Sequence, residues 1–380
     1  MSITAFAGAD LALPQGLLAN QALLVRGGRI ARIVPRAELP AGCTIEELQG
    51  GVLAPGFIDV QVNGGGGVLL NDRPTVEGVK AIAAAHLRFG TTGLMPTLIS
   101  DDVEKIDRAI DAVEGAISAG TRQVLGLHLE GPYLNPAKRG IHDARNIRPM
   151  DDTALERLTR KGQGLRMVTL APELAEPGTI AELTRAGVQV CAGHSLATYE
   201  QIQAALAEGL AGFTHLFNAM SQLTAREPGI VGAALESRAS LFGLIADGQH
   251  VHPAAMRIAL AARGADGVML VTDAMPTVGS PEPFFQLGDH RIVADDLACR
   301  AADGTLAGSN LDMATAVRNA LGLLHVDIST ALGMASANPA RFLGMIARRG
   351  QIVPGADADL VHLDASLRVN RVWLAGNPAV

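Results

Sequence analysis

Short apolar, β-rich runs alternate with helix-like segments through the middle of the chain. Most runs are followed by Ala-, Leu-, Glu- and Arg-rich stretches long enough for a crossover helix, such as residues 76–88 and 199–208. Strand–helix alternation repeated eight times is typical of a (β/α)₈ barrel, the TIM-barrel fold of the α/β class. The eight predicted strands cover residues 57–63, 91–98, 124–130, 165–170, 188–194, 212–218, 241–246 and 268–273.

A doubly wound open sheet is the main competing fold for the same alternation. Its dinucleotide-binding version needs a Gly-x-Gly-x-x-Gly turn that opens a helix after the first strand. No such turn follows the run at residues 57–63. The pattern therefore favours the barrel.

The two ends of the chain have a different pattern, with short predicted strands separated by turns. Residues 1–52 and residues 350–380 each contain too few strands for a stable sheet with its own core. We predict that they pair into one small β-sandwich domain beside a barrel domain of residues 53–349. Two independent terminal extensions are the alternative.

Three residues with metal-binding side chains fall at or near the ends of predicted barrel strands. Glu130 closes the third strand, His194 closes the fifth, and His215 lies in the sixth. A single histidine in an apolar run is more often a hydrogen-bonded core residue, but a carboxylate at a buried strand end is costly unless it is paired or bound to a metal. The carboxyl ends of parallel barrel strands converge on one face. Two histidines and a carboxylate there leave a coordination position open, which is the pattern of catalytic zinc.

Other polar residues fall on the same predicted face. Gln61 and Asn63 close the first strand, His250 follows the seventh, and Asp273 closes the eighth. Residues far apart along the chain are therefore expected to meet in one pocket at the carboxyl ends of the strands.

Composition narrows the class of protein. The 380 residues are 48% hydrophobic and 18% charged, a balance that supplies a large core and excludes intrinsic disorder. The net charge of -7, without a dense Lys/Arg stripe, indicates neither a nucleic acid nor a membrane partner. The three cysteines are far apart, which argues against a disulfide framework and favours a reducing compartment. We recognise no signal peptide and no apolar run long enough to span a bilayer. We expect a cytoplasmic protein.

Several motifs resemble the amidohydrolase superfamily, and within it the N-acetylglucosamine-6-phosphate deacetylases. Pro-Gly-Phe-Ile-Asp at 55–59 is typical of the superfamily as a whole. The combination of three longer motifs is more specific to the deacetylases: His-Leu-Glu-Gly-Pro at 128–132, Thr-His-Leu-Phe-Asn-Ala-Met at 214–220 and Arg-Glu-Pro-Gly at 226–229. The resemblance extends over essentially the whole chain.

One departure from the superfamily pattern concerns the number of metal ions. Many members carry His-x-His at the end of the first strand and hold two ions, whereas this chain has Gln61-Val62-Asn63. Neutral amides are poor metal ligands beside imidazole. The resemblance therefore implies one divalent ion per subunit, with zinc preferred and iron, cobalt or manganese possible, and it leaves a second, weakly held ion open. Gln61 and Asn63 would hydrogen-bond water or neighbouring ligands.

The resemblance also implies a reaction and a set of residues. The reaction is hydrolysis of N-acetyl-D-glucosamine 6-phosphate to D-glucosamine 6-phosphate and acetate, in amino-sugar catabolism. Asp273 would act as general acid and base, and His142 would polarise the acetyl carbonyl. Arg226 suits a phosphate and would serve the neighbouring subunit of a homodimer. The residues implied to contact substrate are Gln61, Asn63, Ile141, His142, Asn218, Ala219, Arg226, His250, Leu306, Ala307 and Gly308.

Three alternatives remain: the first is also an enzyme, and the other two, an inactive scaffold and a binding protein, belong to different classes. A related amidohydrolase acting on N-acetylgalactosamine 6-phosphate or another acylated amine would need nearly the same site. A catalytically inactive barrel used as a scaffold, or a sugar-phosphate binding protein without turnover, should have lost the ligands or the acid/base. Glu130, His194, His215 and Asp273 are all present, which weighs against both.

Overall fold

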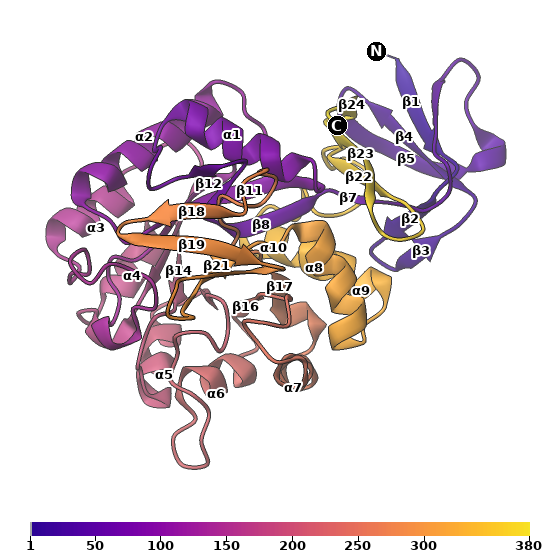
Figure 1. Ribbon diagram of the computed structural model, residues 1–380. Helices are drawn as coiled ribbons and strands as arrows, with labels where there is room; N and C mark the ends of the chain where they lie inside the picture. The colour runs from indigo at the N-terminus through magenta and orange to yellow at the C-terminus, as the bar shows by residue number, and fades with distance from the viewer. Residues whose placement is uncertain (1) are drawn as a thin grey trace.

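The computed structural model describes residues 2–380, and its centre is a ring of eight parallel strands (Figure 1). Each strand pairs with the next one along the chain, from β8 to β17. The ring closes where the Asp273 amide donates to the Gln61 carbonyl at 3.0 Å and the Asn63 amide donates to the Ala274 carbonyl at 2.9 Å. The strands are β8 (Phe57–Val62), β11 (Thr91–Ile99), β12 (Gly126–Glu130), β13 (Leu165–Leu170), β14 (Val188–Ala192), β15 (Gly212–Phe213), β16 (Leu241–Leu244) and β17 (Val268–Leu270).

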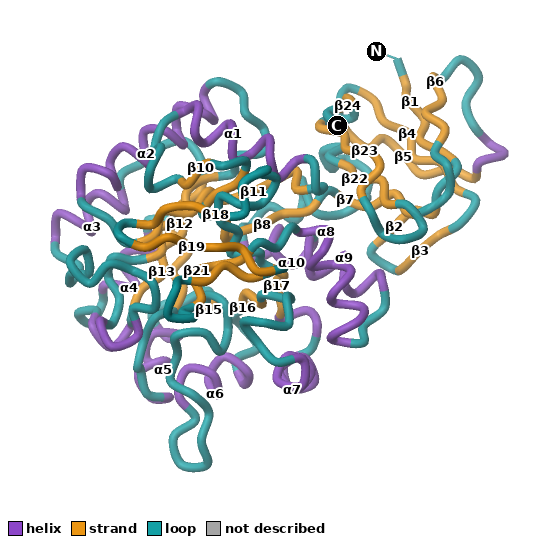
Figure 2. The backbone as a smooth tube through the Cα atoms, in the orientation of Figure 1, coloured by secondary structure: helices purple, strands orange, loops and turns teal. Residues whose placement is uncertain are grey.

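Helices surround this ring, as Figure 2 shows. Several begin at a side chain that accepts a hydrogen bond from a backbone amide of the first turn, for example Thr75, Asp102 and Thr198. The helices are α1 (Val76–Leu87), α2 (Val103–Ser118), α3 (Asp152–Thr159), α4 (Thr179–Arg185), α5 (Tyr199–Ala207), α6 (Gly229–Glu236), α7 (Pro253–Arg263), α8 (Met313–Asn319), α9 (Ile328–Ala335) and α10 (Ala337–Phe342). Within residues 2–380, none of them is both long and apolar enough to cross a membrane.

The barrel strands are apolar because both of their faces are covered. Every residue of β8, β11 and β12 is buried, with side chains directed alternately into the barrel and toward the helices. One continuous apolar cluster joins strands and helices through residues such as Leu94, Val168 and Val190. The predicted barrel is confirmed, and the open sheet is excluded by the closure between β8 and the segment after β17.

Five of the predicted strands extend too far. The first ends at Val62, the fifth at Ala192, the sixth at Phe213, the seventh at Leu244 and the eighth at Leu270. His194, His215 and Asp273 therefore lie beyond their strands, and only Glu130 closes one. The apolar runs continue past the last ladder hydrogen bonds because the first residues of each loop are still buried against the barrel.

The chain ends together form two sheets packed face to face. β7 of the N-terminal part pairs antiparallel with β22, so the alternative of independent extensions is wrong. Phe6 and Trp373 meet edge to face in the apolar layer between the sheets, with ring centroids 5.2 Å apart. One sheet holds β5 (Arg29–Pro35), β4 (Gln21–Arg26), β1 (Ile3–Ala7) and β6 (Thr44–Glu47); the other holds β24 (Asn377–Pro378), β23 (Val369–Leu374), β22 (Leu360–Leu363), β7 (Val52–Pro55), β2 (Asp10–Leu13) and β3 (Gly16–Leu18). The division at residues 52/53 and 349/350 stays a prediction.

An antiparallel sheet inserted after β17 lies at the same end of the barrel as the site. The sequence pattern did not predict it as a separate element. Its last strand contacts the segment after β17 through an isolated bridge between Ala274 and Ser309. Its strands are β18 (Phe284–Leu287), β19 (His290–Asp295), β20 (Ala298–Arg300) and β21 (Leu306–Ser309); a small hairpin of β9 (Gly64–Gly65) and β10 (Val68–Leu69) follows β8.

Candidate metal-dependent active site

Glu130, His194 and His215 converge at the carboxyl ends of the barrel strands. The Nε2 atoms of His194 and His215 lie 3.2 and 2.8 Å from Oε1 of Glu130 and 3.1 Å from each other. All three side chains are buried. Although burial raises the pKa of Glu130, the neighbouring imidazoles of His194 and His215 hold that pKa well below its usual range. A carboxylate and two imidazoles are therefore held at one point.

The tautomer of His194 shows what this point is suited to hold. Its Nδ1 lies 2.8 Å from the carbonyl oxygen of Lys138, which can only accept. Nδ1 therefore carries the proton, and Nε2 of the neutral ring presents a lone pair toward the other two groups. The Glu130 carboxylate and the Nε2 atoms of both histidines face this same point. The donor set fits one divalent ion with nitrogen and oxygen ligands.

Residues of the site adopt backbone conformations that L-residues rarely take. His194, His215 and Asp273 have φ values of 49°, 32° and 53°, and Ala219 has 51°. Such left-handed residues persist only where the surrounding structure fixes them, and they are common at functional sites. Of these residues, His194 and His215 lie two positions past β14 and β15 and Asp273 lies three past β17, and their side chains line the cavity at the barrel mouth.

Asp273 is held by the side-chain amides of Gln61 and Asn63. Its Oδ1 accepts hydrogen bonds from Nε2 of Gln61 at 3.1 Å and from Nδ2 of Asn63 at 2.6 Å. The Gln61 amide also donates to both oxygens of Glu130, at 3.1 and 3.2 Å. Burial, followed by the charge of Glu130, raises the pKa of Asp273 to about 6. Asp273 can therefore take up and release a proton near neutral pH.

His142 is buried beside His194, with ring centroids 4.6 Å apart. The backbone amide of Ser100 donates to its Nδ1 at 3.2 Å, and the Ser100 hydroxyl lies 2.8 Å from the same atom. Because Nδ1 accepts, Nε2 of the neutral ring carries the proton. Burial, followed by the neighbouring His194, lowers the pKa of His142 to about 3. The ring is thus a neutral hydrogen-bond donor, which suits a developing oxyanion.

A cavity of about 230 Å³ opens above these groups. His250 reaches it from the loop after β16, and its Nδ1–H donates to Asp247 at 2.5 Å. Of the site residues predicted from sequence, all but Gln61 and Arg226 line the cavity: Asn63, Glu130, Ile141, His142, His194, His215, Asn218, Ala219, His250, Asp273, Leu306, Ala307 and Gly308. Gln61 lies buried beneath them.

Arg226 lies outside the cavity of its own chain. It is exposed on the loop between β15 and α6, which extends away from the barrel (Figure 1). The residues that line the cavity, all within the described part of the chain, include no lysine or arginine. A phosphate bound in this cavity would meet no lysine or arginine side chain of the same chain.

Sequence reasoning missed some residues of the site. Ile99, Gly140, Met275 and Thr305 also line the cavity. Ile99 ends β11, so the rule that strand ends converge could have found it and the neighbouring Ser100. The remaining three lie in loops whose approach to the cavity depends on the fold.

Comparisons with known proteins agree with this geometry. The model of the Amidohydrolase family matches residues 52–379. The N-acetylgalactosamine-6-phosphate deacetylase of Shewanella sp. (strain ANA-3) is 45% identical over 329 residues, which are 87% of this chain and 83% of the relative. The crystal structure of N-acetylglucosamine-6-phosphate deacetylase from Pasteurella multocida has a TM-score of 0.96 at 32% identity and is covered completely, as is this chain.

A second solved structure holds a ligand. It is a mutant of the N-acetyl-D-glucosamine-6-phosphate deacetylase from Mycobacterium smegmatis in complex with N-acetyl-D-glucosamine-6-phosphate. It has a TM-score of 0.91 at 31% identity, and the match covers 100% of this chain and 99% of that one.

Proposed function

The chain belongs to the amidohydrolase family, among the deacetylases of 6-phosphorylated N-acetylhexosamines, and we propose that it hydrolyses N-acetyl-D-glucosamine 6-phosphate to D-glucosamine 6-phosphate and acetate. The observation that carries the proposal is the joint placement of Glu130, His194, His215, Asp273 and His142 around one cavity. A metal-ligand set, an acid/base and an oxyanion donor are the three parts that amide hydrolysis needs.

Glu130, His194 and His215 would hold one divalent cation, which when bound lowers the pKa of a water molecule toward about 7 and polarises a carbonyl. We propose zinc as the native ion, with iron, cobalt and manganese as the other candidates. The inactive scaffold is disfavoured because no part of this set is missing. Metal analysis of the purified protein should give about one ion per chain; two tightly bound ions would contradict the proposal.

In the proposed reaction, Asp273 transfers the proton and His142 stabilises the developing negative charge. The attacking water forms a bond to the acetyl carbon and gives its proton to Asp273, whose pKa near 6 suits a base at neutral pH. His142 donates its Nε2–H to the acetyl oxygen, on which negative charge develops. Asp273 then returns the proton to the nitrogen as the carbon–nitrogen bond breaks, which releases acetate and the free amine.

The sugar and phosphate would occupy the rest of the cavity. The groups available to contact them are Ile141, Asn218, the backbone of Ala219, His250 and the segment of β21 that lines the cavity. We propose that the phosphate is bound by Arg226 of a second copy in a homodimer, since the cavity lining within residues 2–380 has no cation. A planar guanidinium can donate two parallel hydrogen bonds to phosphate oxygens.

Arg226→Ala tests the phosphate assignment. Loss of charge-assisted hydrogen bonds worth about 1.5–3 kcal/mol each should lower kcat/KM for the phosphorylated sugar roughly 10–100-fold, and should change kcat/KM for the unphosphorylated sugar little. Arg185→Ala, at an exposed arginine in the last turn of α4, is the matched control. Equal losses on both sugars would contradict phosphate recognition.

Mixing two impaired variants tests whether Arg226 acts across subunits. Asp273→Asn and Arg226→Ala chains are each deficient alone. In a mixed dimer, one site combines an intact Asp273 with the intact Arg226 of its neighbour, so turnover should recover. No recovery after exchange of subunits, or a fully active monomer, would place Arg226 in its own chain's site or away from any site.

N-acetyl-D-galactosamine 6-phosphate is a second candidate substrate, favoured by the 45% identity to the Shewanella enzyme. The two sugars differ only in the configuration of the 4-hydroxyl, far from the acetamide. Acetate release from both epimers, compared as kcat/KM on the same metal-loaded preparation, decides between them. Preference for the galacto epimer would replace the first proposal with the second, and activity on neither would point to another acylated amine.

A further inference from the structure

Glu173 joins two loops of the site without lining the cavity. It lies in the single turn η3 (Pro172–Leu174) that follows β13. Its Oε1 accepts hydrogen bonds from Nδ2 of Asn135 at 2.9 Å and from the backbone amide of Leu196 at 2.7 Å. Its Oε2 accepts a hydrogen bond from the hydroxyl of Ser195 at 2.5 Å. One carboxylate thus holds the loop after β12 and the loop after β14.

These two loops meet at the metal ligand His194. The backbone amide of Asn135 donates to the His194 carbonyl at 2.9 Å, and the amide of Lys138 donates to the Asn135 carbonyl at 2.8 Å. The Lys138 carbonyl in turn accepts from Nδ1–H of His194 at 2.8 Å. With Ser195 following His194 directly, the hydrogen bonds form a closed ring that begins and ends at Glu173. The Lys138 carbonyl is therefore linked to the Glu173 carboxylate through Asn135.

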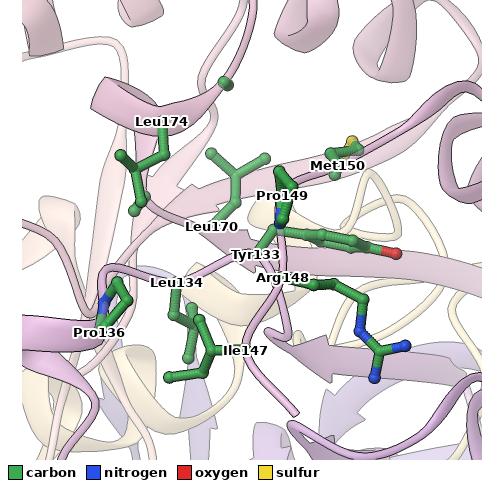
Figure 3. Close-up of a pocket in the computed structure, with 11 residues that line it drawn as sticks. Tyr133, Leu134, Pro136, Ile147, Arg148, Pro149, Met150, Leu170 and Leu174 are labelled. Carbon is green, nitrogen blue, oxygen red and sulfur yellow. The ribbon is translucent and has the colours of Figure 1, made fainter. Parts of the chain in front are cut away.

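Apolar packing between the loop after β12 and η3 is incomplete. A cavity of about 230 Å³, distinct from the active-site cavity, separates them. Figure 3 shows Leu134 and Pro136 of the loop on one side of it and Leu170 and Leu174 on the other. On the side that faces the cavity, these side chains lack close-packed partners. One backbone hydrogen bond, from the Ala171 amide to the Tyr133 carbonyl at 2.9 Å, joins the two segments at the base of the loop. The hydrogen bond between Asn135 and Glu173 joins them beyond the cavity.

The conformation of His194 makes such support necessary. Its φ of 49° is a strained value for a residue with a side chain. A residue in this region returns to an extended or helical conformation unless its neighbours are fixed. Glu173 fixes the two residues that follow His194 and, through Asn135, the segment that accepts its ring proton.

We propose that Glu173 is a positioning residue for metal binding: it holds the loops so that the Lys138 carbonyl fixes the Nδ1–H tautomer of His194 and leaves Nε2 free for the ion. Partners that orient a metal-bound histidine typically contribute about 10–100-fold in metal affinity. Glu173 acts on that partner through the backbone. The inference shares the metal site with the proposed function but is independent of its substrate.

The test is the affinity of the purified metal-free protein for Zn²⁺, measured by competition with a chromophoric chelator. Glu173→Ala removes all three hydrogen bonds and should weaken Zn²⁺ binding by about 10–100-fold. Glu173→Gln keeps an acceptor oxygen for Asn135 and Leu196, and its amide can donate to Ser195, so its affinity should stay close to that of the wild type. Wild-type affinity in Glu173→Ala would overturn the proposal.

Glu208→Ala is the matched control for general destabilisation. Glu208 accepts hydrogen bonds from the backbone amides of Gly178 and Ala181 of the same region, at 2.9 and 3.4 Å. The Glu208→Ala variant should have a lower thermal midpoint and unchanged Zn²⁺ affinity. A loss of Zn²⁺ affinity equal to that of Glu173→Ala would overturn the proposal. If Glu173→Ala does not fold, Ser195→Ala removes a single contact of the carboxylate and should weaken Zn²⁺ binding in the same direction. Because no sugar is used, the result stands apart from a failure of the proposed deacetylation.

Discussion

Asp59 offers a sharp test of the electrostatics beneath the site. Its side chain is completely buried on β8, below Gln61. Its Oδ2 accepts from the Thr272 hydroxyl at 2.5 Å, and its Oδ1 accepts from the backbone amides of Gln61 and Thr272 at 3.1 and 3.4 Å. Burial raises the pKa of Asp59 from 3.8 to about 7, although these hydrogen bonds oppose the rise.

The sign and size of the effect on stability follow from this pKa. Because the folded state binds the proton more tightly, the contribution of Asp59 to folding is fully present below pH 3.8 and is lost as the pH rises through about 7. The difference between the two pKa values corresponds to about 4 kcal/mol, at about 1.4 kcal/mol for each tenfold change in proton affinity. Between pH 5 and 8 the wild type should lose about 2–3 kcal/mol of it.

Asp59→Asn removes this titration while keeping an acceptor for the two backbone amides. The free energy of unfolding should be measured by urea titration of the metal-free proteins at several pH values from 5 to 8, since a bound ion would add its own stabilisation. The stability of the variant relative to the wild type should rise by about 2–3 kcal/mol over this range. Asp152→Asn, at an exposed aspartate of α3, should show a constant offset. Parallel curves for Asp59→Asn and wild type would refute the reasoning.

Three further variants test other parts of the structure. Asp273→Asn should lower kcat by about 10²–10⁴-fold with one metal ion per chain retained; near-normal turnover would contradict its acid/base role. Gly308→Ala should impair turnover more than Gly304→Ala, because both have positive φ but only the Cβ at 308 would meet the Met275 side chain, at 2.6 Å; equal effects in a kinetic assay would argue against the clash. Trp373→Ala should lower the free energy of unfolding by about 3–5 kcal/mol, measured by urea titration, and a loss below about 1 kcal/mol would show that the terminal sheets are not held by this side chain.

The barrel and the metal ligands followed from local patterns. A strand buried on both faces is mostly apolar, and the run at residues 165–170 was placed to the residue as β13. Glu130 stands out for the same reason, because a carboxylate that ends such a run needs a partner. The resemblance to the deacetylases added His142 and the segment of Leu306, Ala307 and Gly308, whose loops carry no periodic signal of their own.

The ends of the strands were harder to predict than their centres. The run at residues 212–218 was predicted as one strand, yet β15 ends at Phe213, and His215 follows in a left-handed turn. Hydropathy does not distinguish a buried strand from a buried turn, since both exclude water. The conformation is fixed by hydrogen bonds to neighbouring strands, such as the Leu216 amide donating to the Gly243 carbonyl at 2.8 Å.

The sequence by itself determined the strand–helix alternation and the convergence of Glu130, His194 and His215. It also determined that Gln61 and Asn63 stand where two-metal relatives carry His-x-His. These depend on periodicity and side-chain chemistry, which are properties of short segments.

Only the tertiary structure decided the tautomers, proton affinities and positions of the groups in the site. It fixed the tautomers of His142 and His194, because Ser100 and Lys138 lie 42 and 56 residues away along the chain. It raised the pKa of Asp273 through burial, and it brought the Glu173 carboxylate between two loops. Ring orientation and proton affinity depend on partners that only folding brings together. A short sequence pattern therefore cannot predict these properties.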